Sequence, residues 1–493
     1  MSLNKMKSYW IAGALFALVF SALLIIRLDL LNKIFSTPQT LSISTLSVHP
    51  GRDTWMNIFQ KDKKIGFSHK TFTKKKKGYL LQENVFMRIN TMGMVQDITL
   101  KTHGVLNDDF TLSSFDFKIS SGRFSFSASG SVSGDVIKIK TKSSGAFRTF
   151  DIKLKKKPYI AAGILDAIRV AGLKAGGKFT FDVFDPATMG QEPVIVSVVG
   201  KENIKSMGSM KIATKLLLNF KGATQLAWIG EDGEVLREKG LLGISLEKTT
   251  RQDALYGLPL ETGEDLTKVA SIASNVVIKD IATLQTLKLE ISGIKYNDVN
   301  VHGERQTLID NILTVEKEPL SDLAPTLDVD KLDTLEKIFL QPGPFIQSDH
   351  QKIKDKAKNI TRDEIVPLEK AKKLIAWVYK NIEKRPVLSV PDALSTLENR
   401  VGDCNEHAVL LAALARASGI PARIETGLAY LNGRFYYHAW NLLYLGRWIT
   451  ADSVFNQIPA DVTHVRFTTG SLKQLDLMSI IGKVKIKVIS PTT

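Results

Sequence analysis

Cysteine is almost absent from this sequence. Cys404 is the only cysteine in 493 residues, which excludes an internal disulfide and leaves the fold to depend on its packing. Without a second cysteine pair, the spacing of Cys404 and His407 is poor evidence for zinc, so we predict neither a metal nor a cofactor. The length suits about two or three domains with a sizeable core.

Negative charge is also in deficit, and the formal net charge is +16. Much of the lysine alternates with apolar residues, at 137–140, 152–155 and 484–488. This alternation is typical of the solvated face of a half-buried strand. Lysines 74–77, followed by Gly78, indicate a hairpin tip. No nucleic-acid motif accompanies these charges, so we predict no nucleic-acid partner, whereas weak attraction to anionic surfaces stays open.

A long uncharged apolar run occupies residues 9–26. At about 1.5 Å per residue, a helix there spans about 27 Å, close to the thickness of a hydrocarbon core. A cleaved signal peptide normally has a shorter apolar region, so we predict an uncleaved membrane anchor. Because Lys5 and Lys7 precede the run, we expect a cytoplasmic N-terminus and the bulk of the chain on the other side.

The region after the anchor indicates β structure. Phe124, Phe126 and Ala128 alternate with serines, and residues 231–234 are a hairpin signal between two apolar runs. We expect mostly antiparallel β, as an open sheet, a half-barrel or a sandwich. Helices are predicted within it at 161–173 and 266–284. The region has no paired carboxylates or metal-ligand spacing, so its sequence indicates no function.

Cys404 lies where a helix is expected to begin. Asp403 is a good N-cap, and Glu406 three residues later completes a capping box. The helix is expected to run to Ser418, since Gly419 and a proline follow. The positive end of the helix dipole favours thiolate at this position. A single cysteine is more often a small buried residue, so the motif needs partners before it indicates a nucleophile.

Two downstream segments supply those partners. His438 lies in a strand-like run and Asp452 in the returning strand. A two-residue turn would place their side chains on opposite faces of the hairpin. With a three-residue turn at 445–447, Tyr444 pairs with Trp448, and the histidine and aspartate become diagonal neighbours on one face. A catalytic role therefore requires this odd-length turn, or a bulge. A helix-borne thiol, a strand-borne histidine and an orienting carboxylate are the set used in covalent acyl transfer.

Residue types and order from about 345 to 470 resemble the transglutaminase-like superfamily, papain-like cysteine enzymes found in bacterial envelopes and in animal cross-linking. The segments that carry the resemblance are RVGDCNEHA at 400–408, ARASGIPAR at 415–423, HAW at 438–440, Trp448 and Asp452. The resemblance implies Cys404 as nucleophile, His438 as general base and acid, and Asp452 as the residue that fixes the imidazole. The family commonly has proline and threonine after this aspartate, whereas this chain has Ser453 and Val454.

The resemblance implies a thiol enzyme that cleaves or transfers acyl groups of peptide or side-chain amides through a thioester. Its substrate would be a peptide or protein of the cell envelope. Trp440 and Asn405 are candidates for the walls of the substrate cleft, although core packing explains the tryptophan equally well. The alternative is a catalytically silent binding or scaffold protein that keeps the fold. The sequence indicates neither the oligomeric state nor the choice between hydrolysis and cross-linking.

The predicted fold class is α+β, with a transmembrane helix, a mostly antiparallel β domain and a papain-like C-terminal domain. Together with the anchor, the resemblance indicates a single-pass protein of the bacterial inner membrane that is mostly periplasmic. Helical patterns at 350–360, 367–382 and 393–397 precede the cysteine. The predicted organisation is a cytoplasmic tip and anchor at 1–27, a linker at 28–50, a β-rich domain at 51–318, a linker at 319–344, a catalytic domain at 345–470, and a C-terminal strand and tail at 471–493.

Overall fold

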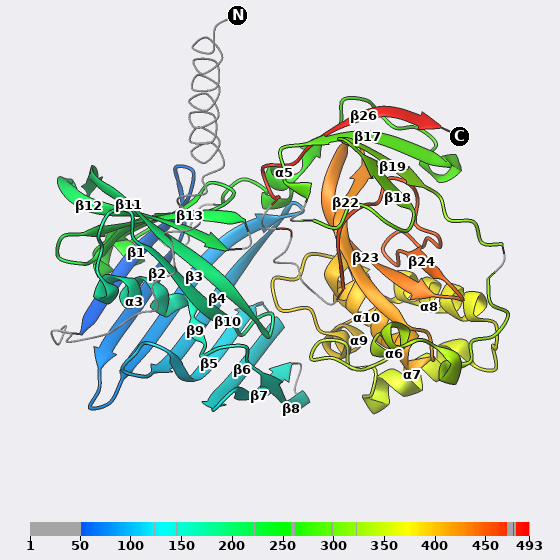
Figure 1. Ribbon diagram of the computed structural model, residues 1–493, viewed down its shortest axis with the longest axis horizontal. Coiled ribbons are helices and arrows are strands. Elements are labelled where there is room, and N and C mark those ends of the chain that lie inside the picture. Colours follow the sequence, from blue (N-terminus) through cyan, green and yellow to red (C-terminus); the bar gives the residue numbers. More distant parts are fainter. Residues whose placement is uncertain are drawn as a thin grey trace, which may run out of the picture.

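The computed structural model describes residues 51–122, 124–143, 146–220, 222–257, 262–296, 299–321, 323–470, 477 and 480–492. The predicted anchor at 9–26 and the predicted linker at 28–50 lie outside these residues. Figure 1 shows two bodies side by side, one formed by strands β1 to β15 and the other by the elements from β16 onward.

The fold class expected from the sequence has to be corrected. The described residues are mostly β, with 48% in strands and 19% in helices, and many of them belong to one large sheet. The expected papain-like domain is present only in part. Its central sheet takes in strand β16 (Ile272–Ala273), which precedes the expected boundary. The sequence patterns correctly predicted single strands and hairpins. They gave no information about how many hairpins would pair edge to edge in one sheet.

The expected localisation is also wrong. Within the described residues, no helix is long and apolar enough to cross a membrane, which contradicts the expectation of a single-pass inner-membrane protein.

The large sheet has 15 strands in the order β8-β7-β6-β5-β4-β3-β2-β1-β15-β14-β13-β12-β11-β10-β9. Each strand pairs antiparallel with its neighbour, except that β9 and β10 are parallel. The first and last strands of the region therefore lie side by side in the middle. The strands are β1 (Arg52–Gln60), β2 (Lys63–Lys74), β3 (Tyr79–Thr91), β4 (Met94–Leu106), β5 (Leu112–Ser121), β6 (Phe124–Ser133), β7 (Val136–Ser143), β8 (Ala146–Lys153), β9 (Tyr159–Ile160), β10 (Lys178–Asp185), β11 (Gly190–Ser206), β12 (Ser209–Phe220), β13 (Ala223–Gly230), β14 (Val235–Lys239) and β15 (Ile244–Thr249).

Local patterns predicted several of these strands and turns. Lys74 pairs with Tyr79 across the lysine-rich hairpin tip, and Ile229 pairs with Val235 across the turn at 231–234, so both predicted hairpins are confirmed. On β7 the isoleucines are buried and the lysines between them are exposed, as the alternation predicts.

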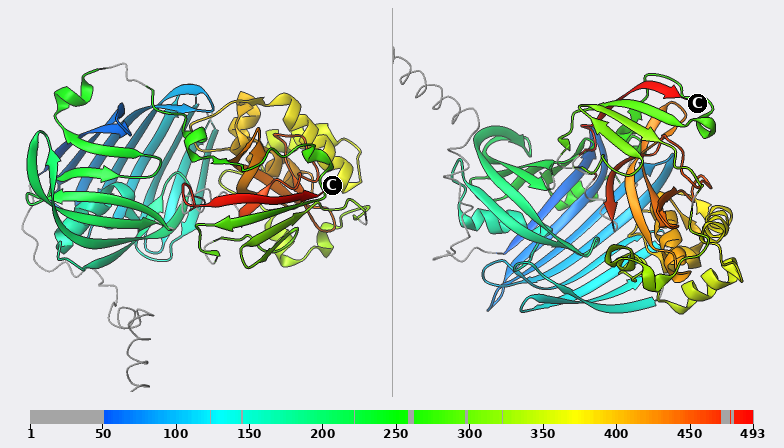
Figure 2. Two further views of the ribbon diagram at one scale, coloured as in Figure 1. Left: turned by 90° about the horizontal axis from the view of Figure 1, so that it is seen from above. Right: turned by 45° about the vertical axis from the view of Figure 1, so that its right-hand side comes forward.

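The two halves of the large sheet curl toward each other (Figure 2). Phe115 on β5 and Phe184 on β10 meet with ring centroids 5.6 Å apart, within a core that both halves share. Helix α3 (Ile164–Ala171) lies in this core and buries Ile164 and Ile168. The predicted helix at 161–173 is thus confirmed in its central part, preceded by the short turn η1 (Ala161–Gly163).

The second helix predicted in this region, at 266–284, is wrong over most of its length. Within this range only α5 (Leu266–Ala270) is α-helical; a short helix, α4 (Arg251–Leu255), precedes it. The chain then becomes extended in β16, where Ile272 pairs with Phe435, and later forms the turn η2 (Ile281–Thr283). Pairing with a distant strand therefore overrides the local helical pattern.

The second body is built around a five-stranded sheet and the helix that begins at Cys404. The sheet has the order β16-β23-β22-β25, with β24 paired to β23. Helix α10 packs against β22 and β23 in one apolar core, and helices α7, α8 and α9 pack against α10. The elements are η4 (Val329–Lys331), α6 (Thr334–Ile338), α7 (Gln351–Thr361), α8 (Pro367–Asn381), β20 (Glu383–Lys384), α9 (Ala393–Asn399), β21 (Val401–Gly402), α10 (Cys404–Ala417), β22 (Ala422–Leu431), β23 (Arg434–Tyr444), β24 (Trp448–Ala451) and β25 (Val465–Gly470).

A four-stranded sheet of order β18-β19-β17-β26 covers this body. Strands β17 (Thr286–Ser292), β18 (Gln306–Ile309) and β19 (Ile312–Glu316) pair with β26 (Lys485–Thr492) from the C-terminal end. Their buried side chains share a core with Leu428 on β22 and Phe467 on β25. The sheet pairing thus groups residues 286–316 with the region around Cys404, although the sequence placed them in the β-rich domain.

This grouping predicts a stability effect. Leu313 on β19 is fully buried in the shared core, whereas Ile309 on β18 is 67% exposed. We expect Leu313→Ala to destabilise the body around α10 by about 2–5 kcal/mol, and Ile309→Ala to change its stability by less than about 0.5 kcal/mol. Since Cys404 is the only cysteine, its alkylation during a urea titration reports this unfolding. An unchanged midpoint for Leu313→Ala would show that the small sheet unfolds separately.

Candidate active site

The start of helix α10 has the geometry that its sequence predicts. Cys404 is its first residue, and the capping box is present. The Asp403 carboxylate accepts the backbone N–H of Asn405 at 2.8 Å, and Glu406 accepts the N–H of Asp403 at 2.9 Å. A Cβ atom on Gly402 would lie 2.2 Å from the Cβ of Glu406, so only glycine lets the chain enter the helix here.

The turn between β23 and β24 has the predicted length of three residues. Tyr444 pairs with Trp448, and the N–H of Leu445 donates to the carbonyl of Arg447 at 2.9 Å. Gly446 adopts a φ of 94°, which a side chain would disfavour. This register places His438 and Asp452 on the same face of the hairpin.

His438 and Asp452 are in direct contact. His438 Nε2 lies 2.6 Å from Asp452 Oδ2. The ladder between the two strands ends one residue earlier, and Asp452 instead forms a bridge with Gln457. Asp452 Oδ1 accepts the backbone N–H groups of Val454 and Phe455 at 2.6 and 3.2 Å. The aspartate therefore holds the turn that follows it, although this chain lacks the family's proline and threonine there.

Helix α10 packs against strand β23, and Cys404 lies against the cluster that contains Ala439. The backbone N–H of Ala439, the residue after His438, is close enough to the Cys404 sulfur to lower the pKa of the thiol. Deeper in the body, the Asn441 side chain donates to the carbonyl of Ala408 at 2.9 Å and ties the strand to the helix. The structure thus gathers the three residues that the sequence singled out as a triad, while their catalytic roles stay predictions.

His464 is a member of this cluster that the sequence analysis missed. Its Nε2 lies 2.9 Å from Asp452 Oδ2, the oxygen that also contacts His438, and its Nδ1 lies 3.2 Å from Asp461 Oδ1. The His464 side chain is fully buried. Asp461 also accepts both the N–H and the hydroxyl of Thr463, at 2.8 and 2.6 Å. The only signal in the sequence was an aspartate three residues before a histidine.

Charge is strongly coupled along this chain of contacts. Burial alone raises the pKa of the Asp452 carboxyl, but His438 and His464 outweigh burial and hold this pKa well below its usual range. Burial lowers the pKa of His464, yet the Asp452 and Asp461 carboxylates raise it to about 9. The Asp461 pKa is likewise held below its usual range, mainly because His464 outweighs its burial. His464 is thus an imidazolium at neutral pH, between two carboxylates.

The Cys404 thiol shows the opposite pKa shift to the one that its helix position predicts. Burial raises the pKa of the thiol well above its usual value, and Asp403 and Glu406 raise it further. The N–H of Ala439 lowers this pKa but does not outweigh burial. The helix position still favours thiolate, but desolvation and two neighbouring carboxylates oppose it and raise the pKa of the thiol.

The remaining sequence candidates have other surroundings. Trp440 is buried, donates from Nε1 to Glu425 at 2.8 Å, and packs edge-on against His464. Asn405 is half-buried beside its N-cap. His407 is buried, with Nδ1 2.7 Å from the carbonyl of Asp403, and burial lowers its pKa. The tryptophan and His407 thus pack within the body, and the cleft roles of Trp440 and Asn405 stay predictions.

The same cluster contains potential metal ligands. His438, Asp452 and His464 each present a ligand atom, all within 4.8 Å of one another. The donor types fit a divalent metal. A metal needs unprotonated imidazole nitrogens, so it would have to replace the contacts that both histidines make with the same Asp452 oxygen.

Comparison with known proteins agrees with the resemblance in this region. Residues 354–453 match the family model of the Transglutaminase-like superfamily and form a transglutaminase-like domain. The match includes Cys404, His438 and Asp452 and ends before His464. No curated protein matches the chain.

Several solved structures resemble parts of the chain. A candidate cysteine protease from Cytophaga hutchinsonii is 21% identical, with a TM-score of 0.29, and the match covers 42% of this chain and 86% of that one. A candidate protease from Parabacteroides distasonis is 12% identical, with a TM-score of 0.18, and the match covers 75% of this chain and 67% of that one. Both TM-scores lie below 0.5, so neither structure is evidence for the fold.

The raised thiol pKa predicts how Cys404 responds to pH. Iodoacetamide reacts with thiolate, so the alkylation rate follows the thiolate fraction. We expect the rate for the folded chain to keep rising above about pH 9, where an ordinary thiol with a pKa near 8.5 is already mostly ionised. The rate is measured by mass spectrometry, with Cys404→Ala as the unlabelled control. A rate that levels off below pH 8 would contradict the raised pKa.

The contacts of His464 predict a second titration. Because its pKa is raised to about 9, its imidazolium should persist at pH 8, where an ordinary histidine is neutral. Its contribution to folding stability is then complete below about pH 6.5 and lost as pH rises through about 9. NMR of the 8 histidines checks this, with His464→Gln assigning the resonance. Titration of that resonance near pH 6.5 would refute the charged state.

Proposed function

We propose that this chain is a thiol-dependent enzyme of the transglutaminase-like type, which cleaves or transfers acyl groups of peptide or side-chain amides. The contact that carries the proposal is His438 Nε2 to Asp452 Oδ2 at 2.6 Å, beside the helix that begins with Cys404. The roles are Cys404 as nucleophile, His438 as general base and acid, and Asp452 as the residue that orients the imidazole.

The resting site differs from a preformed thiolate–imidazolium pair. Burial and carboxylates favour the neutral thiol at Cys404. The positive charge of His464 already neutralises Asp452, at the oxygen that His438 also contacts. We infer a neutral thiol at rest, with transfer of its proton to His438 coupled to nucleophilic attack.

The reaction then follows from these protonation states. His438 takes the Cys404 proton as the sulfur attacks the amide carbonyl, and the oxyanion forms near the backbone N–H of Cys404 at the helix start. The tetrahedral intermediate collapses as His438 gives its proton to the departing amine, which leaves a thioester. Water or a second amine attacks the thioester, His438 takes its proton, and the thiol is regenerated. Water makes the enzyme a peptidase or amidase, and an amine makes it a transamidase.

The positions of His464 and Asp461 suggest a supporting role. Asp452 is held by His464 on one oxygen and by two backbone N–H groups on the other. This holds the carboxylate in one orientation, so His438 meets it in one geometry. His464 is a positioning residue in this proposal, since its described contacts are with the two aspartates and neighbouring rings.

The proposal is tested by variants of the triad and a peptidyl acyloxymethyl ketone, which traps an activated thiol. Cys404→Ala should abolish labelling, and His438→Gln and Asp452→Asn should slow it by roughly 10²–10⁴-fold. Asp363→Asn, at an exposed position in the same body, is the matched control. Release of peptide amine, against incorporation of a fluorescent primary amine, separates hydrolysis from transfer.

Folding of each variant is checked by tryptophan fluorescence in urea. Labelling that survives in Cys404→Ala would refute the proposed nucleophile. Equal labelling rates in the wild type and in folded Asp452→Asn would instead favour a scaffold that keeps the domain without its chemistry.

A further inference from the structure

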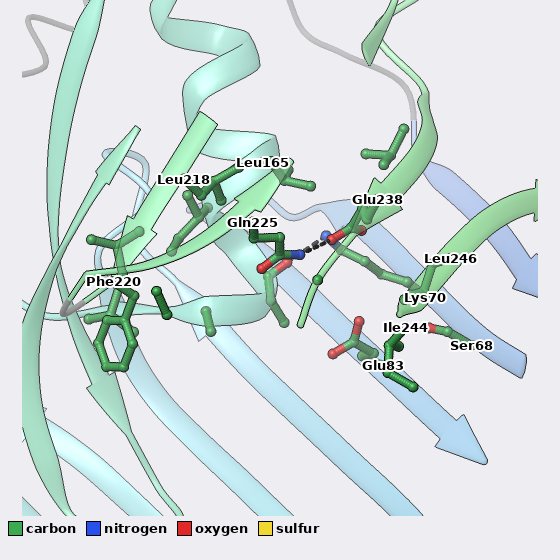
Figure 3. Close-up of a pocket in the computed structure, with 18 of the residues that line it drawn as sticks. Ser68, Lys70, Glu83, Leu165, Leu218, Phe220, Gln225, Glu238, Ile244 and Leu246 are labelled. Carbon is green, nitrogen blue, oxygen red and sulfur yellow. Dashed lines mark hydrogen bonds between the residues drawn. The ribbon is translucent and has the colours of Figure 1, made fainter. Parts of the chain in front are cut away.

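The large sheet encloses a cavity away from the candidate active site. Its volume is about 760 Å³, and it lies between the two curled halves of the sheet and helix α3 (Figure 3). Cavities of about 300–1,000 Å³ are typical of small-molecule sites. Strands β1, β2 and β3 line it from one half, and β11 to β15 from the other.

One side of the cavity is apolar. Leu165 from α3, together with Leu218 and Phe220 from β12, forms this side in Figure 3. An apolar lining of this kind favours a ligand with a hydrocarbon body, because burial of its surface is worth about 25 cal/mol per Å².

The other side carries charged groups that are poorly balanced. Lys70 faces three carboxylates, those of Glu83, Asp166 and Glu238, which also line the cavity. Lys70 and Glu83 are cross-strand neighbours on β2 and β3. One ammonium group therefore stands against three acidic groups in a space that is largely shielded from water.

The lysine is already engaged within this cluster. Lys70 Nζ lies 2.6 Å from Asp166 Oδ2 and donates to the carbonyl of Ala162 at 2.5 Å. Glu238 accepts only an amide N–H, from Gln225 at 2.7 Å. Glu83 makes no direct hydrogen bond or ion pair within the part of the chain that the structure describes. Two carboxyl groups thus lack a positively charged partner of their own.

We propose that this cavity binds a small amphiphilic amine, with its ammonium group beside Glu83 and Glu238 and its apolar body against Leu165, Leu218 and Phe220. The ammonium group supplies the missing positive charge and N–H donors for both carboxyl groups. An anionic head group would meet three carboxylates and would have to displace Asp166 from the lysine. The cavity thus selects against fatty-acid-like ligands, although its lining suits their chains.

Arg52 and Arg169 also lie near this cluster; the charge of Arg169 acts on Asp166, whereas Lys70 is the cation that acts on Glu83 and Glu238. Arg52 lines the cavity but donates to the carbonyls of Asp232 and Gly233 in the turn at 231–234. The described hydrogen bonds of the Arg52 guanidinium therefore go to that turn. Asp185 and Glu192 also line the cavity, so its acidic groups extend beyond the three that face Lys70.

The test compares three probes of equal chain length on the full chain: dodecylamine, dodecanol and dodecanoate. Binding is measured by calorimetry below their aggregation concentrations. We expect dodecylamine to bind at least tenfold more tightly than dodecanoate at pH 8. The double variant Glu83→Gln/Glu238→Gln should remove this preference and keep the binding of dodecanol. Glu231→Gln, at an exposed residue in the turn at 231–234 that is paired with Lys201, is the matched control.

The wild type gives a second test that needs no variant. Burial raises the pKa of Glu83, and it raises that of Glu238 to about 7. Protonation removes the negative charge, so the affinity for dodecylamine should fall as pH drops from 8 to 6, whereas that for dodecanol should not. Equal affinity for amine and carboxylate probes, an unchanged preference in the double variant, or no saturable binding would overturn the proposal. None of these outcomes bears on Cys404.

Discussion

The arrangement of the candidate site in the second body depends on the Asp452 carboxylate. This carboxylate is buried and has four hydrogen-bond partners. Two imidazoles contact one oxygen, and two backbone N–H groups donate to the other. A buried carboxylate without such partners is strongly unfavourable. Strand β23, the chain after β24 and the approach to β25 must therefore all converge here. The same four partners explain why the aspartate stays ionised and why the turn after it needs no proline.

Features that rest on neighbouring residues were predictable from the sequence. The capping box at Asp403 and Glu406, the three-residue turn at 445–447 and the hairpin after Lys74 each depend on a few adjacent positions. Each has a short-range physical cause. The capping box satisfies unpaired N–H groups at the helix start, and the turns follow from the alternation of side chains along a strand and from glycines with a positive φ. The order of Cys404, His438 and Asp452 could be recognised because each lies within such a local motif.

Features that depend on distant residues were not predictable in this way. The helix position of Cys404 favoured a thiolate, but the burial that reverses the shift comes from the packing of α10 against other elements. The pKa of His464 is raised by Asp461, three positions away, and by Asp452, twelve positions away, and the second contact depends on the fold. The pairing of β1 with β15 joins the two halves of the large sheet across nearly 200 residues, and no local alternation encodes it. The cavity follows from that pairing, because Lys70 on one half and Glu238 on the other both line it.

The turn at 445–447 imposes a parity rule on the chain. Successive side chains of a strand point to opposite faces, so the number of residues between Tyr444 and Trp448 decides which face of β24 every later side chain occupies. Deletion or insertion of one residue in this turn would keep every reactive side chain, but it would move the Asp452 side chain to the opposite face of the hairpin from His438. A homologue with that change would keep all the motif residues in its sequence but would lose the arrangement of the site. Inspection of this spacing is therefore a stricter guide to function than the presence of the three residues.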